Sequence, residues 1–222
     1  MKLHDRTVGS TTSLPKTLRG LHMAKTVDFY FAVSSPWTYL AGPRFRELVQ
    51  RNQLVVNWKP FDVSRVFGLT GTKPVKERPP QIQANRLTDL ARWRSFLKMD
   101  LNLEPKFFPV NPIPAARTII SGLQKGVDVM DLANAYMAAV WVQERDISDP
   151  ETIMAIAGEQ GLDGTALFNG VEDDSVIREL ANNTQEAVDR NVFGTPTWIY
   201  KEELFWGQDR LGFLTRAVES SD

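Results

Sequence analysis

The stretch Ser35-Pro36-Trp37-Thr38 stands where a predicted strand meets a predicted helix, a position that can carry chemistry. Many thiol-redox proteins have a Cys-X-X-Cys pair at such a junction, but this 222-residue chain contains no cysteine. Disulfide exchange, thiolate metal ligands and a thiol nucleophile of the protein's own are therefore excluded. Ser35 remains a hydrogen-bond donor at a helix N-terminus, where the free N–H groups and the dipole amount to about half a positive charge. Such a position stabilises an anion supplied by another molecule, or Ser35 simply caps the helix.

Histidine chemistry is restricted as well, because the only two histidines, His4 and His22, precede the first predicted strand. A Ser–His–Asp hydrolase needs an imidazole beside its serine, and zinc sites usually draw on His or Cys. We therefore expect neither a triad nor a metal. The stretch that holds the histidines is rich in Ser and Thr and has no apolar block, so it is not a secretory signal. Residues 1–24 are predicted to be a flexible extension, with a presequence in residues 1–22 as the alternative.

Two stretches near the C-terminus hold further candidate binding residues. Thr195-Pro196 precedes a predicted strand, where a cis proline would suit a tight turn and leave the backbone of Thr195 free to pair with an extended peptide. An ordinary loop proline is the alternative. In "ELFWGQDRLGFL", Gly207 permits a sharp turn and Asp209 can cap the final helix. Asp209 and Arg210 side by side could also hold the ammonium and carboxylate of a zwitterion.

The elements that must position these residues are β-containing at both ends of the chain and helical in the middle. Residues 26–33 and 53–61 are aromatic and β-branched, and a helix connects them, which predicts a βαβ unit. A short hairpin over 196–207 and a helix over 208–218 close the chain. Between the two β-containing parts, helical patterns cover residues 82–99, 114–125, 129–145, 149–160 and 173–191.

The composition narrows the function classes. The chain is 42% hydrophobic and 24% charged, with a net charge of −1. It is long enough to bury a sizeable core, and its balanced charge gives no electrostatic reason to bind nucleic acid. No apolar run approaches the ~18 residues that a membrane-spanning helix needs. We therefore expect neither a nucleic-acid partner nor a membrane.

Four stretches together resemble the 2-hydroxychromene-2-carboxylate isomerase family, within the DsbA-like and kappa-class glutathione transferase superfamily. They are "VDFYFAVSSPWTYLA", "FFPVNPIPAAR", "VFGTPTWIY" and "ELFWGQDRLGFL", of which the last is the most specific, and the resemblance extends from Lys25 to Ala217. It implies an α/β, thioredoxin-like fold with an all-helical domain, residues 62–190, inserted between an N-terminal βαβ unit and a C-terminal ββα unit. The thioredoxin-like domain would then comprise residues 25–61 and 191–222. A homodimer is also implied, and we expect it in the cytoplasm, or in an organelle if residues 1–22 act as a presequence.

The resemblance implies glutathione as the cofactor, which would bring the thiol that the chain lacks. Ser35 matches the family position whose hydroxyl contacts the glutathione sulfur. Thr195, before the expected cis-Pro196, matches the backbone partner of the cysteinyl part. The residues that match those holding the γ-glutamyl end are Trp206, Gly207, Gln208 and Asp209.

The activity that the resemblance implies is a glutathione-dependent isomerisation in the catabolism of aromatic compounds. Transient addition of the thiolate would open the ring of 2-hydroxychromene-2-carboxylate, or of a related small aromatic substrate. Rotation and loss of glutathione would then give trans-o-hydroxybenzylidenepyruvate. Two alternatives stay open: a kappa-class-like transferase that conjugates glutathione to electrophiles, and a non-catalytic thioredoxin-fold module that binds peptides or partners.

The substrate side of the site departs from the family pattern. Some family enzymes carry a lysine after the second strand, where this chain has Phe67 and Gly68, and Arg65 is the nearest cation. Asn111 matches a family asparagine, but Pro112 follows it where an aromatic hydroxyl can occur. We nevertheless expect substrate contacts at the positions that correspond to these family positions, which are Phe67, Gly68, Asn111 and Pro112.

Overall fold

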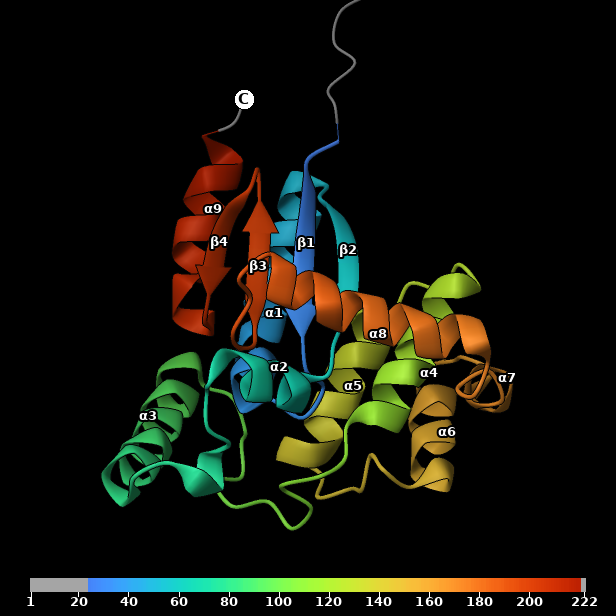
Figure 1. Ribbon diagram of the computed structural model, residues 1–222, viewed down its shortest axis with the longest axis horizontal. Helices are drawn as coiled ribbons and strands as arrows, with labels where there is room; N and C mark the ends of the chain where they lie inside the picture. The colour runs from blue at the N-terminus through green and yellow to red at the C-terminus, as the bar shows by residue number, and fades with distance from the viewer. Residues whose placement is uncertain (1–23, 221–222) are drawn as a thin grey trace, which may run out of the picture.

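The computed structural model describes residues 24–220, which form a four-stranded sheet in the order β2-β1-β3-β4 with helices on both of its faces (Figure 1). β1 and β2 run parallel, and helix α1 (Pro36–Asn52) connects them. β3 pairs antiparallel with both β1 and β4, so a hairpin closes the sheet. The strands are β1 (Thr26–Phe31), β2 (Val55–Pro60), β3 (Thr197–Tyr200) and β4 (Glu203–Trp206).

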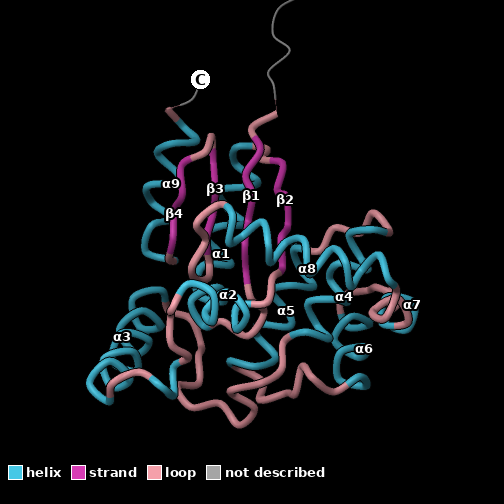
Figure 2. Tube along the Cα trace, in the orientation of Figure 1, coloured by secondary structure: helices cyan, strands magenta, loops and turns pink. Residues whose placement is uncertain are grey.

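The helical block between β2 and β3 is present as predicted, with additional short elements. The four strands gather at one end of the molecule, and most of the helices lie at the other (Figure 2). Helices were expected in the regions of α3 to α6 and of α8, but not at α2 or α7, which are eight and five residues long. The block consists of α2 (Val63–Thr70), a 3₁₀ turn η1 (Val75–Glu77), α3 (Pro80–Leu97), α4 (Ile113–Gln124), α5 (Met130–Trp141), α6 (Pro150–Glu159), α7 (Gly164–Phe168) and α8 (Asp174–Asp189).

Two differences from the expected boundaries lie near the chain ends. The closing helix predicted over 208–218 is divided into a 3₁₀ turn, η2 (Gln208–Arg210), and α9 (Leu211–Glu219). Residues 1–23 lie outside the described part of the chain, and with them almost all of the expected extension at residues 1–24. Among the helices that are described, none is long and apolar enough to cross a membrane.

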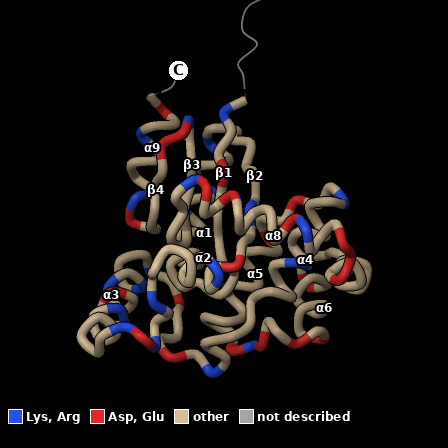
Figure 3. Tube along the Cα trace, in the orientation of Figure 1, with Lys and Arg blue, Asp and Glu red and all other residues tan. Residues whose placement is uncertain are grey.

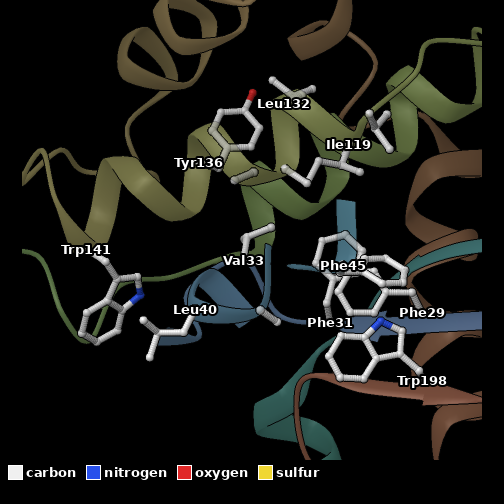
Figure 4. Packing of buried hydrophobic residues seen from close by; sticks show 14 of the residues in the cluster. Phe29, Phe31, Val33, Leu40, Phe45, Ile119, Leu132, Tyr136, Trp141 and Trp198 are labelled. Atoms are coloured by element: carbon white, nitrogen blue, oxygen red, sulfur yellow. The ribbon is translucent and has the colours of Figure 1, made fainter. Parts of the chain in front are cut away.

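Stacked aromatic rings hold the sheet against α1. Trp198 of β3 is fully buried and lies nearly parallel to Phe29 of β1, with their ring centroids 5.3 Å apart and their planes 6° apart (Figure 4). Phe31 also stacks on Phe29, with the ring centroids 4.8 Å apart, and the ring centroid of Phe45 in α1 lies 5.4 Å from that of Trp198. Each large aromatic side chain buries much apolar area, so this cluster fixes the end of β1. Ser35 follows shortly after that end.

The same hydrophobic cluster continues without a break into the helical block (Figure 4). Leu132 and Tyr136 of α5 and Ile119 of α4 belong to it, and all three are fully buried. Trp141 also joins the two parts, because its indole N–H donates to the carbonyl of Ser34 at 3.2 Å. The expected thioredoxin-like and helical domains therefore share one core, and their boundaries at residues 61/62 and 190/191 stay a prediction.

Helix α8 crosses the face of the sheet opposite α1 and is held there by charged groups (Figure 1). Glu186 accepts a hydrogen bond from the Tyr30 hydroxyl at 2.6 Å and from the Lys59 ammonium at 2.7 Å. These contacts link α8 to β1 and β2. Burial alone would raise the pKa of Glu186, but the hydrogen bonds from Lys59 and Tyr30 outweigh it and lower the pKa below its ordinary value.

Candidate active site

Ser35 is the N-cap of α1 and also lines a cavity. Its Oγ accepts the backbone N–H of Thr38 at 3.3 Å, and Pro36 occupies the first helical position, where its missing N–H costs nothing. Within residues 24–220 the hydroxyl hydrogen of Ser35 has no protein acceptor. Capping thus uses a lone pair of the hydroxyl and leaves its proton free to donate, so the two roles considered for Ser35 are compatible.

The cavity beside Ser35 has a volume of about 390 Å³ and a largely apolar wall. Trp37 of α1, Phe67 of α2 and Phe108 contribute rings to it. A second cavity of about 370 Å³ continues from it and is lined by more polar side chains, among them Asp209. An open cleft therefore leads from Ser35 past Thr195 to Asp209. The residues that line both cavities are Trp37, Arg78, Arg86, Thr195 and Trp206.

Thr195 stands at the middle of this cleft, and its bond to Pro196 is cis, as predicted. The Thr195 hydroxyl oxygen accepts the backbone N–H of Ala32 at 2.9 Å and lies 3.0 Å from the hydroxyl of Thr38. The side chain is thereby occupied inside the protein. The backbone N–H and C=O of Thr195, in contrast, form no hydrogen bond with the part of the chain that the structure describes. They are available to the backbone of an extended ligand.

Trp206 forms the wall where the two cavities join. It is 48% exposed, and its ring lies 4.6 Å from the ring of Phe193. Gly194 makes room for it, because a Cβ at that position would be only 2.4 Å from the indole Nε1. Gly207 follows with φ +98°, a backbone conformation that favours glycine, and the turn there directs the chain into η2.

Gln208 and Asp209 differ in what their side chains are free to do. Gln208 is 2% exposed, and its side-chain oxygen accepts a hydrogen bond from Arg44, which also donates to its main-chain carbonyl at 3.3 Å. Burial lowers the pKa of Arg44, and the nearby charge of Asp209 acts in the opposite direction. Asp209 accepts a hydrogen bond from Arg210 at 2.8 Å and lines the second cavity. Gln208 thus anchors the turn, and Asp209 presents a carboxylate to the cleft.

The four residues predicted to contact substrate are not brought together. Phe67 lines the first cavity, whereas Gly68, Asn111 and Pro112 line neither cavity. The Asn111 side chain accepts the backbone N–H of Ile113 at 3.1 Å, at the start of α4. A Cβ at Gly68 would meet no atom within 4 Å, so this glycine lies in open space. Substrate contact at these three positions stays a prediction.

Several residues of the cleft were not predicted. Trp37 and Phe108 lie in stretches that carry the family resemblance, but the pattern alone did not single them out. Arg78 lies in the turn before α3, and Arg86 lies in α3. No group of three or more His, Asp or Glu residues between residues 24 and 220 is placed to hold a metal ion.

Comparison with known proteins agrees with this architecture. A family model described as a DSBA-like thioredoxin domain matches residues 26–219. The 2-hydroxychromene-2-carboxylate isomerase of Sphingobium xenophagum is 30% identical over 198 residues, which cover 86% of this chain and 97% of that protein. Glutathione S-transferase kappa 1 of Caenorhabditis elegans is 25% identical over 206 residues, 87% of this chain and 90% of that one. A solved structure of a 2-hydroxychromene-2-carboxylate isomerase matches with a TM-score of 0.73 at 25% identity, over 88% of this chain and 95% of that chain.

The sheet order, the cis proline and the matched family model define a thioredoxin-like fold of the DsbA type, as predicted. Within that class, the chain belongs to the 2-hydroxychromene-2-carboxylate isomerase family, so the predicted resemblance is confirmed. Its relatives are isomerases and glutathione transferases, which supports the prediction that the chain is an enzyme.

Proposed function

We propose that the chain is a glutathione-dependent isomerase of the 2-hydroxychromene-2-carboxylate isomerase type. The observation that carries this proposal is the continuous cleft from the Ser35 hydroxyl past the unpaired backbone of Thr195 to Asp209, in a chain without cysteine. Glutathione has a thiol in its middle residue and a zwitterionic γ-glutamyl group at one end. The cleft offers a donor for a thiolate, then a backbone partner, then a charged group. This order matches the order of the groups in glutathione.

The residues near Ser35 can account for an ionised thiol. When bound, glutathione supplies a thiolate that adds to the substrate and leaves again, so that the double bond becomes trans. A thiol with pKa ~8.5 is only a few per cent ionised near pH 7, and lowering that pKa by ~2 units requires ~2.7 kcal/mol. The Ser35 hydroxyl can contribute ~1.5–3 kcal/mol as a donor to a charged acceptor. The N-terminus of α1 adds ~0.3–1 kcal/mol, so the two together suffice.

The remaining residues divide between cofactor and substrate. Thr195 would pair with the cysteinyl backbone, and Asp209 would hold the γ-glutamyl ammonium in the second cavity. The first cavity, with the rings of Trp37, Phe67 and Phe108 around it, would take the aromatic substrate next to Ser35.

A second candidate function is a kappa-class-like transferase, favoured by the kappa relatives that match most of the chain. The two activities differ in the product, since an isomerase regenerates free glutathione, whereas a transferase leaves glutathione covalently attached to the product. We would incubate the protein with glutathione and 2-hydroxychromene-2-carboxylate and weigh the products. An isomer of unchanged mass supports the proposal, whereas a stable adduct with glutathione contradicts it and supports the transferase.

Calorimetry separates both enzymes from the third alternative, a non-catalytic module that binds peptides. No heat of binding with millimolar glutathione would contradict both glutathione-dependent functions. Assembly as a homodimer, a cytoplasmic location and a place in aromatic catabolism are further parts of the proposal. Analytical ultracentrifugation of the purified chain tests the dimer.

A further inference from the structure

Two arginines line the cleft and lie against aromatic rings. Arg86 of α3 has its guanidinium carbon 5.4 Å from the ring centroid of Phe108 and 5.9 Å from that of Trp141. Arg78, in the turn before α3, has its guanidinium carbon 5.8 Å from the ring centroid of Phe67. Figure 3 shows basic positions along α3 and along the segment that precedes it.

Neither arginine has an acidic partner in the part of the chain that the structure describes. Arg78 Nε donates to the carbonyl of Lys73 at 2.8 Å, and the Arg86 side chain forms no hydrogen bond with described protein atoms. No Asp or Glu lines the first cavity. Burial, and then the like charge of Arg78, lower the pKa of Arg86 to about 10, which leaves it protonated at neutral pH. Asp89 and Asp209 line the second cavity, but neither forms an ion pair with Arg78 or Arg86 among the described residues, so both cations face the first cavity without a protein anion.

Other partly buried arginines of the fold have acceptors within the chain: Arg44 donates to Gln208, and Arg94 donates to the carbonyl of Leu101 at 2.8 Å. Arg117 is bound to Glu172 at 2.7 Å, and Arg145 is bound to Glu159 at 2.8 Å, although both arginines are mostly buried. A partly buried guanidinium without a counter-ion is costly, and an anionic ligand removes that cost. The contrast indicates that the partner of Arg86 and Arg78 comes from outside the chain.

We propose that Arg86, with Arg78 beside it, binds the carboxylate of the electrophile and thereby selects acidic aromatic substrates over neutral ones. This inference rests on the proposed function, because it assigns the second cavity to glutathione. A guanidinium can donate two parallel hydrogen bonds to one carboxylate. Phe67 and Phe108, against which the two guanidiniums lie, line only the first cavity, and this favours the substrate as the source of the carboxylate. The glycyl carboxylate of glutathione is the other source.

The test uses two unreactive probes of nearly the same shape, trans-cinnamate and cinnamamide, with the full chain saturated with S-methylglutathione. Calorimetry should show that the wild-type protein binds cinnamate about tenfold or more tightly than cinnamamide. Arg86→Gln should remove this preference by weakening cinnamate binding alone, and Arg86→Lys should restore part of it. The matched control is Arg178→Gln, which replaces an exposed arginine of α8 that lines neither cavity. It should leave both affinities unchanged.

The same variants separate the two sources of the carboxylate. If Arg86→Gln weakens glutathione about tenfold and leaves cinnamate unchanged, the arginines serve the cofactor and the proposal is overturned. Equal binding of cinnamate and cinnamamide by the wild-type protein overturns it as well. If the wild-type protein does not bind glutathione, the proposed function fails. A preference for cinnamate that Arg86→Gln abolishes in the absence of any thiol would still support the carboxylate site. Thermal melting shows whether each variant is folded.

Discussion

The hydroxyl of Thr195 accepts the backbone N–H of Ala32 at 2.9 Å, although the two residues are 163 positions apart. This bond ties the loop before β3 to the end of β1. The Thr38 hydroxyl, 3.0 Å from the same oxygen, adds the first turn of α1 to the junction. Since Ser35 caps that turn, a single side chain sets the distance between the proposed thiol site and the proposed backbone partner of the ligand.

Replacing Thr195 tests this junction. Thr195→Ala leaves the N–H of Ala32 without its acceptor, and we expect the free energy of unfolding to fall by about 1–3 kcal/mol. Glutathione binding should weaken, because the loop is no longer tied to β1 and α1. Thr195→Ser keeps the hydroxyl and should restore both properties. Chemical denaturation and calorimetry measure them, and a Thr195→Ala protein with wild-type values would refute the role of the hydroxyl.

Two substitutions at Ser35 separate capping from thiol stabilisation. Ser35→Ala should remove activity and cost about 1 kcal/mol of stability through loss of the cap. Asp caps a helix as well as Ser does, so Ser35→Asp should keep the stability, but its carboxylate cannot donate to a thiolate and repels it. We expect Ser35→Asp to be inactive and to raise the pKa of the thiol of bound glutathione. The ultraviolet absorbance of the thiolate measures this pKa. Full activity in Ser35→Asp would leave Ser35 with capping alone.

Gly194 should be essential for the cleft because of Trp206. The Cβ of Gly194→Ala would be 2.4 Å from the indole Nε1, so the half-exposed ring must move. We expect a clear loss of glutathione affinity. The destabilisation should be at most about 1–3 kcal/mol, since the ring can move into solvent. Gly212→Ala in α9 meets no atom within 4 Å and is the control. It should raise stability by roughly 0.5–1 kcal/mol and leave binding unchanged. Equal affinities in the two variants would contradict the assigned role of Trp206.

Glu186 should make stability depend on pH in the acidic range. Its pKa is lower in the folded chain than in the unfolded chain, so its contribution is complete above the unfolded pKa and is lost as the pH falls through the folded pKa. The melting temperature of Glu186→Gln should therefore be lower than that of the wild type at pH 7, and the gap should narrow below about pH 4. Glu179→Gln, an exposed position of the same helix, is the control. A gap of constant size from pH 7 to pH 3 would disprove the linkage.

The parts of the fold that could be predicted have strong sequence patterns. The aromatic and β-branched residues of β1, β2 and the hairpin mark them as strands, and long helices such as α4 and α8 have clear apolar periodicity. Helices α2 and α7 contain too few turns for a periodic pattern to be recognised. The proximity of Ser35 and Thr195 follows from the sheet, because β1 and β3 are antiparallel neighbours and the end of β1 meets the start of β3.

The arginines of the cleft could not be predicted for a physical reason. Leu90 is the only fully buried residue of α3, so the helix has no apolar stripe that would indicate which side faces the protein. The orientation of Arg86 depends on how α3 is placed beside α1, and that placement arises from tertiary packing. Arg78 lies in a Pro-rich turn whose course no local pattern determines.

The two sides of the cleft differ in how deeply they are built into the fold. The strand end before Ser35 belongs to the shared core, whereas α2, η1 and α3 together contribute only Val66 and Leu90 as fully buried residues. Substitutions of the exposed residues in this range should therefore disturb folding less than substitutions beside Ser35. A lineage with this architecture could accept a different electrophile by replacing residues of α2, η1 and α3, while the proposed thiol site at Ser35 stays unchanged.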